Sequence, residues 1–264
     1  MSVFVGVDIG SLATKSLVLD SDKGVLSYNI LQSGFDYRNA AEHSIENSIN
    51  QANIKIEDVS FIVSTGYGRA VAMLSTLADA EVTEITCHAK GAHRLFPEAR
   101  TIIDIGGQDS KVISIDETGR VTNFVMNDKC AAGTGRFLEV MSSALSVGIE
   151  GMGDLIFASS EEKVEISSVC TVFAESEVIS LFAKGYKKAD IAAGIADSIA
   201  RRITGFVGQV GLKEKVVMSG GVAKNKGVVR SIEERIGTKL LIPEEPQIVG
   251  ALGAAIVASG RVRT

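Results

Sequence analysis

The chain has 264 residues, of which 45% are hydrophobic and 22% charged, with a formal net charge of −5. This length is enough for one large domain or two modest lobes, and the composition is that of an ordinary globular protein. The acidic balance argues against nucleic-acid binding, no apolar run reaches the roughly 18 residues of a membrane span, and no charged leader precedes the first strand. We therefore expect a cytoplasmic protein with no nucleic-acid partner and no membrane partner.

A repeated pattern organises the first half of the sequence. Residues 5–20 read VGVDIGSLATKSLVLD and residues 101–116 read TIIDIGGQDSKVISID, so that Asp, Gly, Lys and Asp recur in one register without a gap. Each copy combines an apolar strand, a glycine turn and a second β-rich strand, followed by a further turn and a third strand. Chance similarity between two hairpins is the alternative, but the shared positions are not apolar filler. The repeat therefore predicts two β-meanders and a duplicated lobe, with two Asp-Ile-Gly turns that serve one ligand.

The remaining elements alternate between helices and strands, as in an α/β fold. The hydrophobic spacing predicts helices over 39–53, 68–78, 87–95, 133–146, 171–184, 188–210 and 224–236, strands over 59–65, 215–219 and 239–242, and a last helix from about residue 248. In the helix over 171–184, we expect Ala174, Val178, Leu181 and Phe182 to share one face. The pair Arg201-Arg202 is expected to be solvated helix surface.

Three glycine-rich segments have the composition of a nucleotide site. They are DIGSLATK at 8–15, DIGGQDSK at 104–111 and MSGGVAKN at 218–225. In this order, and with the small-residue helix GALGAAIVA at 250–258, they resemble the two phosphate motifs and the adenosine motif of the actin, sugar-kinase and heat-shock-chaperone ATPase superfamily.

This resemblance covers nearly the whole chain and implies its architecture. It implies an α/β fold of two duplicated actin-like (ribonuclease H-like) lobes with the nucleotide, ATP or ADP, between them. The first lobe is expected at 1–98 plus 250–264, with the first phosphate motif and the C-terminal helix. The second is expected at 99–249, with the second phosphate motif, the adenosine motif and two of the cysteines.

The residue types in these segments suit phosphate and magnesium, because glycine lets backbone N–H groups approach a phosphate closely. We expect Asp8 and Asp104 to hold a hydrated Mg²⁺ ion between the lobes. Asp104 and Gln108 are the expected catalytic residues, with Gln108 positioning the attacking water. The expected nucleotide-binding residues are Ser11, Leu12, Ala13, Thr14, Lys15, Gly106, Gly107, Gly220, Gly221 and Gln247. For Lys15, a structural ion pair is the alternative, and for the glycines and aspartates it is the closing of strands and the capping of turns.

The three cysteines, Cys87, Cys130 and Cys170, are an odd number at wide spacing, which argues against a disulfide framework. Cys130 and Cys170 each precede an amphipathic helix, where the helix dipole favours a thiolate suited to iron. Two cysteines are half of the four that a 4Fe–4S cluster requires, and a two-fold dimer would supply the other half. The spacing alone also allows both to be small buried hydrophobes. Cys87, beside His88, is expected to pack beneath the lobes rather than to bind a metal.

Longer strings carry a closer resemblance. NDKCAAGTGRFLE at 127–139, CTVFAESEVIS at 170–180 and STGYGR at 64–69 resemble the activator ATPases of 2-hydroxyacyl-CoA dehydratases, and are similar to the ATPase subunits of benzoyl-CoA reductase. In that family, one 4Fe–4S cluster is held between two identical or similar subunits by two cysteines each. The resemblance therefore implies that Cys130 and Cys170 are the cluster ligands, with one cluster per dimer.

The family resemblance also implies a function. It implies ATP-hydrolysis-driven transfer of one electron, under anaerobic conditions, from a reduced ferredoxin or flavodoxin to a 2-hydroxyacyl-CoA dehydratase or a related cluster-bearing reductase. A small-molecule (sugar-type) kinase of the same superfamily is the alternative, although the chain is short for one, and a non-catalytic nucleotide-dependent interaction protein is a third reading. The sequence does not identify the electron acceptor, nor does it distinguish a homodimer from a dimer of related subunits.

Overall fold

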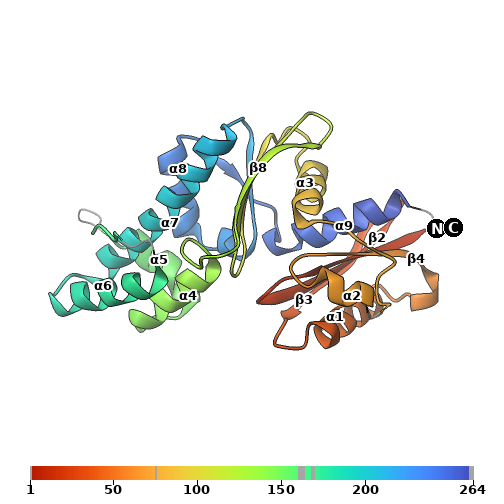
Figure 1. Cartoon of the computed structure of the whole chain (residues 1–264), viewed down its shortest axis with the longest axis horizontal. Helices are drawn as coiled ribbons and strands as arrows, with labels where there is room; N and C mark the ends of the chain where they lie inside the picture. The colour runs from red at the N-terminus through yellow and green to blue at the C-terminus, as the bar shows by residue number, and fades with distance from the viewer. Residues whose placement is uncertain (1, 75, 160–163, 168–169, 262–264) are drawn as a thin grey trace. The chain divides into compact units, whose positions relative to one another are not determined.

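Two five-stranded β-sheets, each built around one of the repeated meanders, organise the chain (Figure 1). The computed structural model describes residues 2–74, 76–159, 164–167 and 170–261. By its internal contacts, the chain divides into two units. The first unit comprises Met1–Ile102, Ile115–Thr122 and Pro243–Thr264, and the second comprises Ile103–Ser114 and Asn123–Ile242.

The first sheet has the strand order β3-β2-β1-β4-β5. Its strands are β1 (Val3–Ile9), β2 (Ala13–Asp20), β3 (Gly24–Gln32), β4 (Val59–Thr65) and β5 (Ala80–Glu81). Strands β1, β2 and β3 are antiparallel neighbours, whereas β4 runs parallel to β1 and to β5. The Asp20 carboxylate closes the turn between β2 and β3, because it accepts hydrogen bonds from the N–H groups of Asp22 and Lys23 at 2.8 and 2.9 Å. The first predicted meander and the predicted strand over 59–65 are confirmed.

Helices cover both faces of this sheet. The helices of the first unit are α1 (Tyr37–Gln51), α2 (Arg69–Leu74), α3 (Glu84–Leu95) and α9 (Val249–Ser259), with short 3₁₀ helices at Ile56–Asp58 and Pro246–Ile248. In Figure 1, α1 and α2 lie on one side of the sheet and α9 on the other. The alternation of side chains along β1 explains this arrangement: Val5 and Val7 pack with Ile45 of α1, whereas Phe4 packs with Ala254 of α9.

Small residues let α9 lie in backbone contact with its neighbours. A Cβ atom on Gly6 of β1 would overlap the carbonyl oxygen of Ala251 in α9, and one on Gly253 of α9 would overlap the carbonyl oxygen of Cys87 in α3. The small-residue sequence at 250–258 therefore serves close packing between α9, β1 and α3.

The second sheet repeats the arrangement of the first. Its strand order is β10-β9-β6-β7-β8, so that, read from β8, its strands follow the same third-second-first-fourth-fifth order as the first sheet. Its strands are β6 (Thr101–Ile105), β7 (Ser110–Ile115), β8 (Val121–Asn127), β9 (Val216–Ser219) and β10 (Leu240–Leu241). The predicted α/β fold with a duplicated sheet is therefore confirmed.

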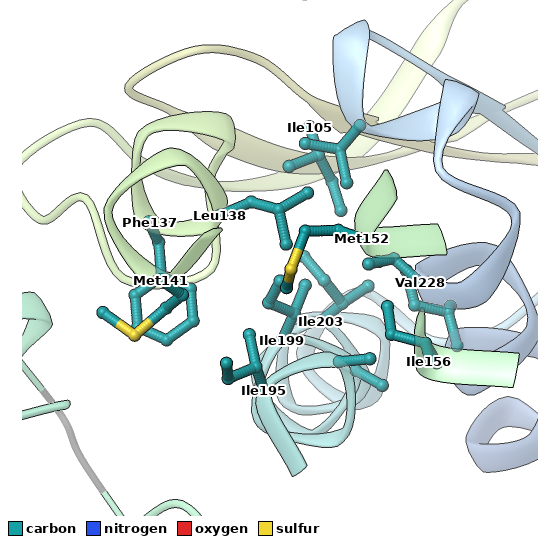
Figure 2. Packing of buried hydrophobic residues seen from close by; sticks show 14 of the residues in the cluster. Ile105, Phe137, Leu138, Met141, Met152, Ile156, Ile195, Ile199, Ile203 and Val228 are labelled. Atoms are coloured by element: carbon teal, nitrogen blue, oxygen red, sulfur yellow. The ribbon is translucent and has the colours of Figure 1, made fainter. Parts of the chain in front are cut away.

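The core of the second unit is built around one long helix. The helices of this unit are α4 (Gly135–Ala144), α5 (Met152–Phe157), α6 (Thr171–Ala183), α7 (Lys188–Val210) and α8 (Lys226–Ile236), with 3₁₀ helices at Ile149–Gly151 and Gly221–Lys224. The span of α7 matches its prediction, and its Ile195, Ile199 and Ile203 recur every four residues and form one buried face. Figure 2 shows this face against Leu138 of α4 and Met152 of α5.

Several other helices differ from their predicted bounds by two or more residues, and for α2 and α4 the backbone gives the reason. Helix α2 is shorter than the predicted helix over 68–78, and Thr76 beyond it has a φ of 57°, in the left-handed region where a helix does not continue. Helix α4 begins at Gly135 rather than at residue 133, because Gly133 has a φ of 79°. Strand β5 and helix α5 are too short for a hydrophobic period, so the sequence pattern does not predict them.

Within the described part of the chain, no single helix is both long and apolar enough to cross a membrane; the pair Gly135–Ala144 and Ile149–Phe157 meets that test only when joined across a 96° bend, by length and composition alone.

Candidate functional site

The first phosphate turn connects β1 to β2. The N–H group of Gly10 donates a hydrogen bond to the carbonyl oxygen of Ala13 at 3.1 Å, which closes the turn. Of the predicted phosphate contacts, Ser11, Leu12 and Ala13 are half-buried, whereas Thr14 is fully buried and its hydroxyl lies 2.9 Å from that of Ser33. The Ser33 hydroxyl also donates to the carbonyl oxygen of Gly10 at 2.6 Å. These hydrogen bonds fix the turn, while Ser11, Leu12 and Ala13 remain partly accessible.

Asp8 is the second-last residue of β1, beside this turn, and is 5% exposed. Its Oδ2 lies 3.3 Å from Nζ of Lys15, whose side chain is 15% exposed, while Oδ1 accepts no hydrogen bond from the described residues. Glycines surround the carboxylate: a Cβ atom on Gly250 would lie 2.9 Å from Oδ2 of Asp8 and 3.0 Å from Nε2 of His88. The side chains of Asp8 and the buried His88 therefore both lie close to Gly250 of α9. The sequence does not predict this proximity.

The second phosphate turn connects β6 to β7 and is held more tightly. The N–H group of Gly106 donates to the carbonyl oxygen of Asp109 at 3.0 Å. The buried Lys111 lies beneath the turn, with its Nζ 2.8 Å from Oδ2 of Asp104 and 2.5 Å from Oδ2 of Asp109. The hydroxyl of Ser219, at the end of β9, donates to Oδ1 of Asp104 at 2.7 Å. Both oxygens of Asp104 thus have buried partners.

The other predicted nucleotide contacts surround this turn or lie in the other unit. Gly107 is half-buried and Gln108 is exposed. Gly220 has a φ of 85° and lies against the backbone of Ile105, at the end of β6. A Cβ atom at this position would overlap the carbonyl oxygen of Ile105. Gly221, which begins a 3₁₀ helix, is exposed. Gln247 belongs to the first unit, where its N–H group donates to Oε1 of Glu245 at 3.0 Å.

The three free cysteines have different surroundings. Cys87 is fully buried, and burial raises the pKa of its thiol from the ordinary 9.0 to about 12. Cys130 and Cys170 are only half-buried and both belong to the second unit. Cys170 is the N-cap residue of α6. Cys130 lies in the loop five residues before α4, so the expectation that it directly precedes a helix N-terminus is wrong for this cysteine. The described residues contain no group of three or more His, Cys, Asp or Glu side chains placed to hold a metal ion.

A direct connection links the loop of Cys130 to the second phosphate turn. The N–H groups of Gly135 and Arg136, in the first turn of α4, donate to the carbonyl oxygens of Gly106 and Gly107 at 2.9 and 2.8 Å. The free N–H groups at the start of a helix thus bond to the phosphate turn itself. A Cβ atom on Gly135 would lie 3.1 Å from the carbonyl oxygen of Gly106, so the close approach favours glycine. In the sequence, only the glycine at position 135 hints at this connection.

Helix α6, which follows Cys170, exposes apolar side chains. Of the residues predicted to share one face, Ala174 and Val178 are buried, but Phe182 is 52% exposed, so its predicted inward orientation is wrong. Val172 and Phe173 are 66% and 72% exposed. An apolar surface of this kind next to a half-buried cysteine is typical of an interaction site.

The duplicated sheet and its covering helices define the fold class, which is that of the actin-like sugar kinases and ATPases. A ROK family glucokinase from Streptomyces griseus, in complex with glucose and AMPPNP, superimposes with a TM-score of 0.64 at 13% identity, over 98% of this chain and 100% of that chain. At that identity the likeness shows the fold alone. More specifically, residues 5–258 match the profile of the BadF/BadG/BcrA/BcrD ATPase family, and the chain belongs to this family.

Two relatives resemble the chain over nearly its whole length. The (R)-2-hydroxyglutaryl-CoA dehydratase activating ATPase of Acidaminococcus fermentans is 46% identical over 259 residues, which are 98% of each chain. The crystal structure of component A of that dehydratase superimposes with a TM-score of 0.94 over 98% of each chain. The activator of the 2-hydroxyisocaproyl-CoA dehydratase from Clostridium difficile, with bound ADPNP, superimposes with a TM-score of 0.90 at 44% identity, over 97% of this chain and 94% of that chain. The family expected from the sequence motifs is therefore confirmed.

Proposed function

We propose that the chain hydrolyses ATP to drive a one-electron transfer from a reduced ferredoxin or flavodoxin to a 2-hydroxyacyl-CoA dehydratase or a related cluster-bearing reductase. Membership of an ATPase family and 46% identity with a dehydratase activating ATPase support this function. The observation that carries it is the pair of backbone hydrogen bonds from Gly135 and Arg136 to Gly106 and Gly107. These bonds connect predicted phosphate contacts to the helix that follows a predicted cluster ligand, Cys130.

Both phosphate turns are proposed to bind ATP. The half-buried residues Ser11 to Ala13 and Gly107 offer backbone N–H groups to phosphate oxygens, whereas the N–H group of Gly106 closes its own turn. The bound ADPNP in a 44% identical relative supports nucleotide binding. Lys15 has only a 3.3 Å contact to Asp8 and is free to turn toward a phosphate. Lys111 instead holds the second turn from beneath.

The carboxylates beside the turns suit Mg²⁺, which prefers oxygen ligands and keeps several of its waters. Oδ1 of Asp8 is available for such an ion, and we assign Asp8 and Asp104 to the hydrated Mg²⁺ of the nucleotide. Bound Mg²⁺ neutralises charge on the phosphate oxygens. We propose that the exposed side chain of Gln108 orients the attacking water.

The half-buried thiols of Cys130 and Cys170 fit an iron–sulfur cluster by their chemistry, since thiolates are the ligands of such clusters. Two thiols are half of a 4Fe–4S ligand set, and we propose that the same two residues of a second copy supply the rest. A bound 4Fe–4S cluster takes up and releases single electrons. The exposed Val172 and Phe173, two and three residues after Cys170, support a covering partner at this place.

Hydrolysis changes the contacts that the phosphate turns make. Because the carbonyl oxygens of Gly106 and Gly107 are bonded to the first turn of α4, a displacement of this turn also displaces α4 and the loop of Cys130. The chain thereby couples the state of the nucleotide to the surroundings of Cys130. Free thiols at this position require a reducing compartment, so we place this reaction in the anaerobic cytoplasm.

The first experiment is the measurement of iron and sulfide content, the absorption and EPR spectra, and the mass in solution of anaerobically purified protein. We expect about four irons per dimer. Cys130→Ser and Cys170→Ser are each expected to lose the cluster spectrum and to weaken the dimer. Cys87→Ser is the matched control, because this thiol is fully buried away from solvent, and it should keep the iron.

Two outcomes separate the candidate functions. A colourless, air-stable monomer that still hydrolyses ATP contradicts the electron-transfer function. Phosphorylation of a small molecule by such a monomer identifies a kinase instead.

A further inference from the structure

Arg202 of α7 lies against the loop that begins at Cys130. A Cβ atom on Gly133 would lie 2.7 Å from Cδ and 3.6 Å from Nε of Arg202. The arginine side chain therefore packs directly beneath the turn at 131–134, which is closed by a hydrogen bond from the N–H group of Thr134 to the carbonyl oxygen of Ala131 at 3.1 Å. The expectation that Arg202 is solvated helix surface is wrong.

The charge of Arg202 has no counter-ion among the described residues. Its Nε atom is buried and makes no hydrogen bond within the described part of the chain, and the guanidinium lies 5.7 Å from the ring centre of Phe206. The neighbouring Arg201 is different, since it is exposed and pairs with Asp197 at 3.4 Å and with Glu165 at 3.5 Å. The buried Nε–H group of Arg202, which has no acceptor in the described part of the chain, costs free energy unless a further acceptor or anion lies beside it.

The position of Arg202 favours a thiolate-bound group as that anion. Gly133 is three residues from Cys130, and three Cα–Cα steps span at most about 11 Å. The second phosphate turn, by contrast, already has a buried cation of its own, because Lys111 pairs with Asp104 and Asp109. Each one-electron reduction adds a negative charge to an iron–sulfur cluster, and net charge is one of the factors that set its reduction potential.

We propose that Arg202 is a positioning residue for the cluster, whose positive charge stabilises the reduced state and makes its reduction potential less negative. This inference rests on the proposed function. Arg202 gains and loses no electron, because the single electron comes from the reduced ferredoxin or flavodoxin and leaves to the partner enzyme. The guanidinium acts through its charge and through its contact with the loop of Cys130.

The test is an EPR-monitored redox titration of the cluster in the anaerobically purified dimer. In Arg202→Gln, the ratio of reduced to oxidised cluster at a given potential should fall about tenfold, which is the effect of a unit charge about 11 Å away at an effective dielectric constant of about 20. This ratio corresponds to a shift of about 59 mV for one electron. Arg202→Lys should retain most of the wild-type potential. Arg201→Gln is the matched control, with the same loss of charge one residue away, and should leave the potential unchanged.

Folding of each variant is followed by thermal melting and iron content. Arg202→Met is prepared beside Arg202→Gln, because its unbranched apolar stem can fill the space beneath Gly133. An unchanged potential in both neutral variants overturns the inference, as does an equal shift in Arg201→Gln. A raised KM for ATP with an unchanged potential also overturns it and assigns Arg202 to the nucleotide. If the wild-type protein shows no cluster signal, the proposed function is contradicted, and this inference is contradicted with it.

Discussion

The two phosphate turns come from the same repeated sequence, yet they hold their lysines differently. In the second turn, Lys111 is buried and bridges Asp104 and Asp109. In the first turn, Lys15 is partly exposed and makes one longer contact, to Asp8. The two lysines, which occupy the same position of the repeat, therefore have different roles. Lys111 fixes the second turn, whereas Lys15 can turn toward a ligand.

The cysteines of the two units also differ in how deeply they are buried. Cys87 of the first unit is enclosed by α9, whereas Cys130 and Cys170 of the second unit remain half-accessible. The second unit thus combines a phosphate turn held by a buried lysine with half-accessible thiols, while the first combines a turn whose lysine is partly exposed with a fully buried thiol. Three predictions test this contrast, and a fourth compares two equivalent aspartates of the repeat.

The largest expected effect is on thiol reactivity in reduced, iron-free protein. At pH 8, Cys87 should react with a thiol reagent about a thousandfold more slowly than an unperturbed thiol, because the thiolate is the reactive form and burial raises its pKa from 9.0 to about 12. Cys130 and Cys170 should be labelled first, as followed by absorbance and peptide mapping. Cys87→Ser should remove only the slow phase, and rapid labelling of Cys87 would contradict its burial.

The next largest effect is expected for Lys111→Met. It leaves Asp104 and Asp109 without their shared buried counter-ion, which should lower the free energy of unfolding by about 3–5 kcal/mol. Urea denaturation measures this loss. Lys226→Met, at an exposed lysine, serves as the control and should stay within about 0.5 kcal/mol of wild type. A loss for Lys111→Met as small as that of the control would remove the difference between the two turns.

Lys15→Met should cost less stability and more function. The longer contact to Asp8 predicts a loss of about 1–2 kcal/mol in the free energy of unfolding. The loss of a charged phosphate contact should raise the KM for ATP about tenfold. Steady-state ATPase assays and urea denaturation check both values. If the KM is unchanged while stability falls as far as in Lys111→Met, Lys15 is a structural lysine as well.

The smallest effect concerns Asp20 and Asp116, which occupy the same position of the repeat. The N–H group of Lys23 is the main cause that lowers the pKa of Asp20, and the N–H group of Arg120 with the Thr118 hydroxyl lowers the pKa of Asp116 from 3.8 to about 2. A lowered folded-state pKa adds stability above the ordinary pKa, and that stability is lost as the pH falls through the folded value.

Asp116→Asn should therefore be slightly less stable than wild type at pH 6, and the difference should disappear between about pH 4 and pH 2. Denaturation midpoints across this range measure it, with the exposed Glu117→Gln as control. A difference that is constant with pH would mean that the charge of Asp116 does not contribute.

Much of this architecture could be predicted from the sequence, because the signals are local. The repeat of Asp, Gly and Lys predicts both meanders, and the isoleucines of α7 give its span. The contacts that shape the candidate site are not local. His88 meets Asp8, and Arg202 meets Gly133, across some seventy or eighty residues of sequence. The bonds from α4 to the second turn join backbone atoms, which leave almost no trace in the residue types.

The position of α9 has a consequence for the synthesis of the chain. The first sheet lies near the start of the chain, but the helix that covers one of its faces is formed by Val249–Ser259. During translation at about 5–20 residues per second, the face of β1 that carries Phe4 and Gly6 remains uncovered for on the order of tens of seconds, until α9 has been synthesised. All of the second unit emerges from the ribosome in this interval, so the first sheet is begun before the second unit and is covered only after it.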